Sequence, residues 1–324
     1  MQAALELTLP IFALVFCGYA GRRFGPISNV AVEAINQFVF LFALPAMLFR
    51  VAASNPLDTL LDPAFAAAWL SAGLAIFGIA YAVGRKGLGG DRAQSAGWGL
   101  NAAHGNVGYM GIPLMSEIGG AKALAPILLI VILDVFIVIT LTIALLELSS
   151  QRNAEGTPPT SKGRATPRDV ARVIALGLAR SPLVLAILIG LLWSASGWPL
   201  PNVLDSFTRL LGGVAGPCAL FAIGASLGGN TIARGVARPL SVLAALKLIA
   251  HPVLAAAAFF WVFPVAPYPA SIGVLAATLP SASNGFIVAQ RYSLDVRSIS
   301  AAIVVGTLVS LLTVSFAIWA LKLH

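Results

Sequence analysis

The chain has 324 residues, of which 59% are hydrophobic and 10% are charged, against roughly 25% charged residues in an ordinary soluble domain. This composition excludes a disordered chain, a disulfide scaffold and a soluble nucleic-acid binder, and it predicts a polytopic membrane protein. The net charge of +8 does not indicate a nucleic-acid partner, because the basic residues gather in loops on one side of the expected bilayer.

Ten apolar runs are each long enough to cross a membrane, since a helical span needs about 20 mostly apolar residues. The first run follows an N-terminus without the basic residues of a signal peptide, so we expect a retained span. Unbroken apolar runs exclude a transmembrane barrel, whose strands alternate. The sequence therefore predicts an all-α transmembrane fold with spans near 3–21, 28–50, 64–84, 93–116, 122–148, 170–196, 203–227, 239–262, 268–290 and 297–321.

The basic residues fix the expected orientation. Most of the 20 lysine and arginine residues lie in every second loop, for example Arg85 with Lys86 and Arg234 with Arg238. Loops rich in lysine and arginine stay in the cytoplasm. We therefore expect a multi-pass protein of the plasma membrane with both termini outside, which agrees with an even number of spans.

Residues 150–169 form a long polar stretch and are expected to be a cytoplasmic linker, with a phosphoregulated segment as the alternative. The linker separates two five-helix halves, 1–149 and 170–324, which contain matching positions at a spacing of 172 to 174 residues. The repeated positions are Pro10 with Pro182, Pro45 with Pro217, and Asn106 with Pro280. Five spans per half is an odd number, so the second repeat would be inverted, as is typical of secondary transporters.

Two of the expected spans contain residues that interrupt a helix. Span four carries Gly105, Gly108, Gly111 and Pro113, and span nine carries the sequence 279–286. Glycine and proline are poor material for a continuous helix. Each interruption would expose a half-helix N-terminus, whose amides and dipole favour an anion. The alternative is that these residues only kink packed spans.

Polar side chains beside the two interruptions add hydrogen-bonding groups. We therefore predict that a small carboxylate binds at Gly105, Asn106, Gly108, Pro280, Ser281, Ser283 and Asn284. Charged or polar side chains inside spans are functional candidates by default. The supporting candidates are Asn101, His104, Pro113, Lys247, Asp134 and Asn36.

Several of these supporting residues allow two interpretations. We expect Lys247 to pair with Asp134, either to attract the anion or replace a coupling cation, or as a structural ion pair. His104 would titrate during transport or remain neutral and bonded to a carbonyl, and His251 is expected to pack or form a hydrogen bond. Asn36 would face the substrate path or bridge helices.

The chain resembles the auxin efflux carrier family. The most specific residues are Gly105-Asn106-Val107-Gly108 with Gly111-Ile112-Pro113, then Leu279-Pro280, residues 286–292, and residues 247–252. The resemblance implies a fold akin to sodium/proton antiporters and bile-acid symporters, with helices four and nine crossing. Helices 1, 2, 6 and 7 would form a scaffold, expected to make a homodimer, and helices 3–5 and 8–10 a transport domain. Bacterial relatives are described as carriers of malonate, malate or similar acids, and the short central loop here does not favour auxin.

The expected function is therefore secondary transport of small organic anions across the plasma membrane. No zinc spacing, P-loop or pair of catalytic carboxylates is present in the sequence, so we expect neither an enzyme nor a bound cofactor or metal. One alternative is a sodium- or proton-coupled symporter or antiporter of the same fold. The other is a sensor or channel-like module without alternating access.

The predicted topology can be tested by labelling a single cysteine in the native membrane. We expect Ser161→Cys to react only after the membrane is made permeable, because the basic linker should face the cytoplasm. Labelling of intact cells with an impermeant reagent would reverse the assigned orientation.

Overall fold

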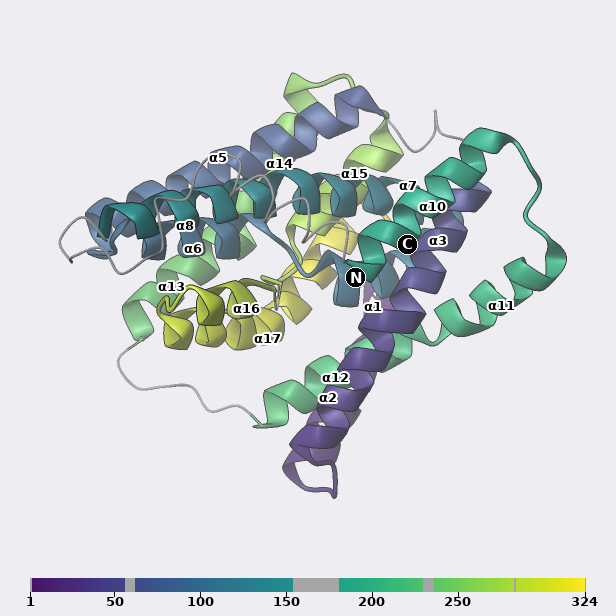
Figure 1. The fold of residues 1–324 in the computed structure, drawn as a ribbon, viewed down its shortest axis with the longest axis horizontal. Coiled ribbons are helices and arrows are strands. Elements are labelled where there is room, and N and C mark those ends of the chain that lie inside the picture. Colours follow the sequence, from purple (N-terminus) through teal and green to yellow (C-terminus); the bar gives the residue numbers. More distant parts are fainter. Residues whose placement is uncertain (1, 56–61, 154–180, 230–235, 283, 324) are drawn as a thin grey trace.

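The computed structural model describes residues 2–55, 62–153, 181–229, 236–282 and 284–323. These residues are helical and contain no sheet; one isolated antiparallel bridge joins Gly105 and Ser281. The α-helices in Figure 1 are α1 (Gln2–Arg23), α2 (Asn29–Phe38), α3 (Leu44–Ser54), α5 (Pro63–Gly87), α6 (Arg92–Ala103), α7 (Ile112–Leu133), α8 (Thr140–Asn153), α10 (Pro182–Ser196), α11 (Asn202–Gly213), α12 (Ala215–Gly229), α13 (Ala237–Ala245), α14 (His251–Ala257), α15 (Pro267–Ala277), α16 (Asn284–Arg291) and α17 (Val296–Ala320). Short π-helical turns are η1 (Val39–Ala43), η2 (Val107–Gly111), η3 (Asp134–Ile139), η5 (Leu246–Ala250) and η6 (Ala258–Val262).

Six helical segments among the described residues are long and apolar enough to cross a membrane. They are Asn29–Ser54, Pro63–Gly87, Lys122–Leu146, Asn202–Gly228, Ala237–Val262 and Val296–Ala320, and Pro182–Ser196 is a shorter apolar helix. An all-helical membrane protein is thus confirmed, whereas the ten-span inverted repeat stays a prediction. Residues 154–169 of the expected linker and 170–180 of the next expected span lie outside the described residues.

Helix boundaries follow from ordinary capping chemistry. The first amide groups of a helix lack partners within it, so an acceptor side chain just before the helix stabilises its start. Ser28 Oγ accepts from Ala31 N at 3.1 Å, Asp62 Oδ1 accepts from Ala64 N at 2.9 Å, and Asp91 Oδ1 accepts from Gln94 N at 2.7 Å. Within α7, Gly120 has a φ of 53° and breaks the helix, which separates the end of expected span four from expected span five.

Two helix pairs pack with their backbones in close contact at glycines. A Cβ atom at Gly18 in α1 would lie 2.0 Å from the backbone oxygen of Phe221 in α12, so only glycine fits. A Cβ atom at Gly190 in α10 would likewise lie 2.7 Å from the backbone oxygen of Phe49 in α3. Positions 18 and 190 differ by 172, as do 49 and 221, which is the spacing of the repeated prolines. The two contacts therefore share one spacing of 172 residues.

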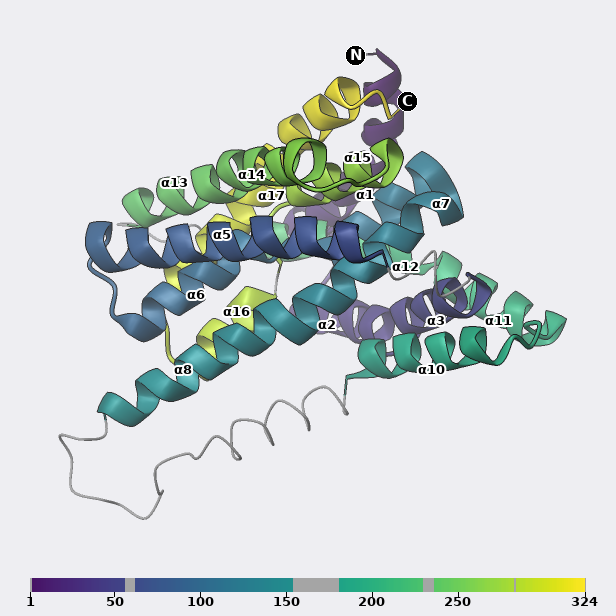
Figure 2. The same ribbon diagram turned by 90° about the horizontal axis from the view of Figure 1, so that it is seen from above.

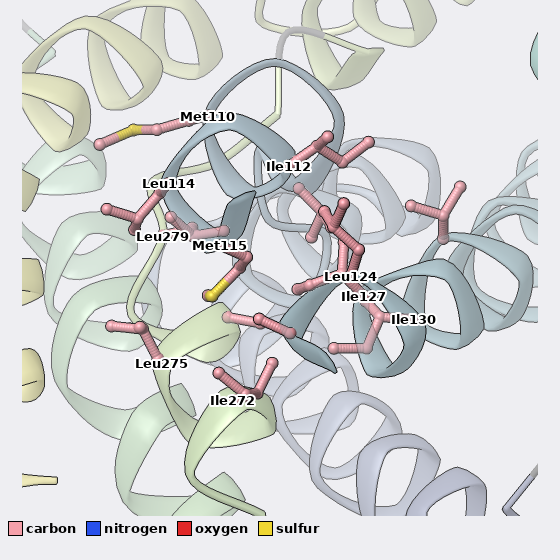
Figure 3. Close-up of a cluster of buried hydrophobic side chains, with 14 of the residues drawn as sticks. Met110, Ile112, Leu114, Met115, Leu124, Ile127, Ile130, Ile272, Leu275 and Leu279 are labelled. Carbon is pink, nitrogen blue, oxygen red and sulfur yellow. The ribbon is translucent and has the colours of Figure 1, made fainter. Parts of the chain in front are cut away.

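The helices lie on two sides of the molecule, and an apolar core packs next to the helix interruptions. Figures 1 and 2 show α5, α6, α8 and α13 on one side and α3, α10 and α11 on the other. Figure 3 shows buried apolar side chains of one cluster, with Met110 from η2, Ile112 and Met115 from α7, Ile272 from α15, and Leu279 just beyond α15. This cluster holds the first half of α7 against α15 and so fixes where the two interrupted segments meet.

The close contact between α1 and α12 gives a test of the fold. Gly18→Ala should lower the free energy of unfolding by about 1–3 kcal/mol, because its methyl group would enter the space of Phe221 O. Gly78→Ala in α5 is the matched control, since a Cβ there meets no atom within 4 Å. We expect a lower Tm in detergent for the first variant only; equal Tm values would contradict the packing.

Candidate functional site

The centre of the molecule is a crossing of two interrupted helices. Helix α6 ends at Ala103 and η2 begins at Val107, while α15 ends at Ala277 and α16 begins at Asn284. Between these ends the two segments of the chain run antiparallel. Asn106 N donates to Pro280 O at 2.7 Å, and Ala282 N donates to His104 O at 3.1 Å. Each interruption thus supplies partners for backbone groups that the other leaves unpaired.

Polar side chains reinforce the crossing. Ser281 Oγ donates to Asn101 O at 2.7 Å and lies 3.1 Å from Asn101 Oδ1. Asn106 Oδ1 accepts from Tyr109 N at 3.3 Å and thereby caps η2. Asn101 Nδ2 is buried and has no hydrogen-bond partner among the described residues. The crossing therefore holds an unused buried donor, which a polar ligand could satisfy.

Four predicted binding residues meet at the crossing, namely Gly105, Asn106, Pro280 and Ser281, with Asn101 and His104 beside them. Gly108 lies in η2, and a Cβ there would meet no atom within 4 Å, so space remains at this point. Ser283 lies outside the described residues. Asn284 is described only as the first residue of α16.

Two further supporting candidates are Pro113 and Asn36. A Cβ atom at Gly216 in α12 would lie 3.1 Å from Pro113 Cβ, so Pro113 packs α7 against α12. Asn36 is half-buried on α2. Among the described residues its side chain makes no hydrogen bond to the crossing segments, and its place on a substrate path stays a prediction.

The buried carboxylate of Asp134 contacts the ring of His104, and the backbone of His104 forms part of the crossing. Asp134 is 1% exposed. Its Oδ1 accepts from Trp69 Nε1 at 2.7 Å, and its Oδ2 lies 2.9 Å from His104 Nδ1. A buried carboxylate is costly unless charge and hydrogen bonds compensate it, and here both oxygens are held.

Lys247 and Asp134, which were expected to pair, do not form a direct ion pair among the described residues. Lys247 Nζ lies 2.9 Å from His251 Nδ1, and the ion pairs of the described residues do not include Lys247 with Asp134. The physical reason is that Trp69 and His104 already occupy both oxygens of Asp134, while His251 stands one helical turn from Lys247. His251 therefore forms the hydrogen bond expected of it, and His104 bonds a carboxylate instead of a carbonyl.

The carboxylate and the lysine belong to one connected set of side chains. The rings of Trp69 and His251 lie 5.6 Å apart between centroids and join the two pairs. A Cβ atom at Gly105 would lie 3.2 Å from Lys247 Nζ, so the glycine lets the backbone of the crossing approach the ammonium group. Asp134 begins η3 and Lys247 lies within η5, and such π-helical turns are frequent at functional sites.

Sequence reasoning missed Trp69, which donates to Asp134 and packs against the ring of His251. A tryptophan in a membrane span needs a partner for its N–H group when it is buried, and that requirement is the signal that could have pointed to it. Among the described residues no group of three or more His, Cys, Asp or Glu side chains could hold a metal ion.

Comparisons with known proteins identify the kind of molecule that carries this site. A family model described as "Membrane transport protein" matches residues 3–318. The chain belongs to this family, the auxin efflux carrier family. The resemblance noted in the sequence is thus confirmed, and the protein is a multi-pass membrane transporter.

Three relatives match along nearly their whole length. The chain is 28% identical to a candidate malonate transporter of Rhizobium meliloti, over 99% of this chain and 97% of that protein. It is 26% identical to a transporter of Methanothermobacter thermautotrophicus, over 99% of both. It is 22% identical to auxin efflux carrier component 8 of Arabidopsis thaliana, over 95% of both.

The buried carboxylate can be tested by comparing two substitutions. Asp134→Ala should leave the donors of Trp69 and His104 unpaired, each at a cost of about 1–3 kcal/mol. Asp134→Asn should retain most of the stability, because its amide oxygen can still accept from Trp69. We expect the Tm in detergent to fall for alanine well below the value for asparagine. An alanine variant as stable as the parent protein would contradict the described contacts.

Proposed function

We propose that this protein is a secondary transporter that moves small organic carboxylates across the plasma membrane by alternating access. The crossing of the 104–106 and 278–282 segments would be the binding site. The observation that carries the proposal is the backbone pairing of Asn106 with Pro280 beside one buried donor, Asn101 Nδ2, that has no partner among the described residues. Non-helical backbone at membrane depth is tolerated only where protein or a water-filled cavity surrounds it, and transporters use such breaks to bind substrates.

The chemistry of the crossing favours an anion. Half-helices begin at η2 and α16, and helix N-termini carry partial positive charge with free amide groups. The ammonium group of Lys247 lies against Gly105, and Asn101 Nδ2 needs an acceptor. A carboxylate would satisfy these donors, and the name of the Rhizobium meliloti relative makes malonate the first compound to test.

The same proposal includes two inverted five-helix repeats, 1–149 and 170–324, joined by the cytoplasmic linker 150–169. The equivalent contacts of Gly18 and Gly190 support this repeat, because they relate the two halves at one spacing of 172 residues. We also propose that helices 1, 2, 6 and 7 form a dimeric scaffold, that the other helices move as a transport domain, and that both termini lie outside.

The second candidate is a cation-coupled transporter of the same fold. It is favoured by the buried pair of His104 and Asp134, since ionisable groups inside a membrane protein commonly mark ion or proton pathways. Both candidates predict saturable exchange of carboxylates. A sensor or a channel-like module predicts no exchange, so counterflow of labelled malonate in proteoliposomes separates these classes.

The binding site can be tested at Asn106. Asn106→Ala should weaken substrate binding by roughly 10- to 150-fold, the equivalent of about 1.5–3 kcal/mol for a hydrogen bond to a charged group. Asn106→Asp keeps an acceptor for Tyr109 N but places a negative charge at the crossing, so it should prevent anion binding.

Affinity should be measured on purified, monodisperse variants with malonate and a panel of other dicarboxylates and monocarboxylates. Ser271→Ala is a suitable control, because Ser271 is exposed on α15 and bonds only within its own helix. If both Asn106 variants bind like the parent protein, the substrate site lies away from the crossing.

A further inference from the structure

A polar network extends from the crossing into the helices around it. It runs from His104 through Asp134 and Trp69 to His251 and Lys247, and all of these side chains are buried. Substrate binding at the crossing does not by itself require an aspartate and two histidines at this depth. Ionisable groups there are costly to keep, so a function for them is expected.

We propose that His104 is a proton-binding site that takes up one proton on Nε2 when a carboxylate occupies the crossing, so that anion and proton cross the membrane together. This inference depends on the proposed function and deepens it by assigning the coupling ion. It also assigns the coupled proton to His104, one of the two side chains that are bonded to Asp134.

The hydrogen bonds around Asp134 determine which atoms carry protons. An indole N–H group can only donate, so Asp134 Oδ1 accepts from Trp69. Asp134 Oδ2 is paired with His104 Nδ1, and an ionised carboxylate can only accept, so Nδ1 carries the hydrogen. The other ring nitrogen, Nε2, then has a free lone pair and no hydrogen-bond partner among the described residues.

His104 is also the most accessible member of this pair. Its side chain is 9% exposed, whereas that of Asp134 is 2% exposed. Water therefore reaches the His104 side chain more readily than that of Asp134, and the second nitrogen of a neutral imidazole can accept a proton. The resulting imidazolium would remain hydrogen-bonded to a carboxylate, which stabilises its charge.

The neighbouring histidine does not offer an equivalent site. Among the described residues, the titratable groups around His104 are Asp134 from η3, Lys247 from η5 and His251 from α14. His251 is fully buried and bonds the lysine side chain, which disfavours a second positive charge beside it. Packed helix α5 contributes the indole of Trp69, and Arg238 of α13 bonds Gly87 O.

Charge balance links protonation to substrate binding. With Asp134 ionised and Lys247 protonated, the network carries no net charge, and each ionised carboxylate group of a bound anion adds one negative charge in a region of low dielectric. A proton on His104 offsets one of these charges, which lowers the cost of moving the anion through the membrane. In this step the Nε2–H bond forms from a proton of water on one side and breaks to water on the other, while the Nδ1–H bond is unchanged.

The backbone links protonation to conformation. His104 follows the last residue of α6 and caps that helix. Its carbonyl oxygen accepts from Ala282 N across the crossing, while its ring holds Asp134. A change in the crossing would therefore move the imidazole relative to its carboxylate and to water.

The experiment uses the full chain in proteoliposomes with malonate as the probe and with the membrane potential held at zero by equal potassium concentrations and valinomycin. A pH gradient, alkaline inside, should drive accumulation of malonate by about tenfold per pH unit for one coupled proton. A sodium gradient at equal pH should drive none. Malonate binding to the detergent-purified protein should also take up one proton, measured by calorimetry in buffers of different ionisation enthalpy.

One substitution and one control test the assignment. His104→Asn places an amide N–H near the position of Nδ1, so it can still donate to Asp134, but it removes Nε2. It should abolish both the accumulation driven by the pH gradient and the proton uptake, each compared with the counterflow of malonate that the same variant shows. Ser271 lies outside the network and bonds only within its own helix, so Ser271→Ala should retain both responses to protons.

The outcomes separate the inference from the proposed function. Absence of counterflow with malonate and with the carboxylate panel would overturn the proposed function and this inference with it. Counterflow without any effect of the pH gradient, or accumulation driven by sodium, would overturn the inference and leave the proposed function standing. Proton uptake that persists in His104→Asn would also overturn it, because the proton would then bind elsewhere.

Discussion

The structure depends on one constraint: a peptide group deep in a membrane must find its hydrogen-bond partner within the protein. Gly105 lies in the interruption between α6 and η2, and Pro280 lies in the interruption between α15 and α16. The two interruptions satisfy each other through the bonds of Asn106 N to Pro280 O and of Ala282 N to His104 O. Once this pairing exists, the side chains beside it are fixed at the centre of the fold.

The polar network follows from that pairing. His104 leaves the helical conformation and its carbonyl accepts from Ala282 N, while its ring lies against Asp134. Gly105 leaves room for Lys247, whose Nζ would lie 3.2 Å from a Cβ atom at that position. The buried charges of Asp134 and Lys247 are then tolerated because each has hydrogen-bond partners and because they oppose each other across the rings of Trp69 and His251. The backbone pairing that packs the two interrupted helices therefore also positions the polar side chains beside the crossing.

Much of this could be predicted from the sequence, because its causes are local. Long apolar runs predict helices, and Gly105 and Pro280 predict where they stop. The sequence also singled out Asn106 and Pro280, and their backbone groups are bonded to each other. The partners of Asp134 could not be predicted, because Trp69 and His104 stand 65 and 30 positions away and π-helical turns change which way each side chain faces. The expected pair with Lys247 was reasonable in charge, but the two side chains form no direct ion pair among the described residues.

In the proposed inverted arrangement, the backbone frame is symmetric and the charges are not. The glycine contacts of α1 and α10 correspond at 172 residues, yet at the same spacing Lys247 corresponds to Ala75 and Asp134 to Gly306. A symmetric frame gives two conformations of similar energy, open to opposite sides. Groups present in only one repeat meet different surroundings in the two conformations, so only they can favour one over the other. The network beside the crossing is thus where a ligand or a proton would shift the equilibrium, because its charges have no counterpart in the other half.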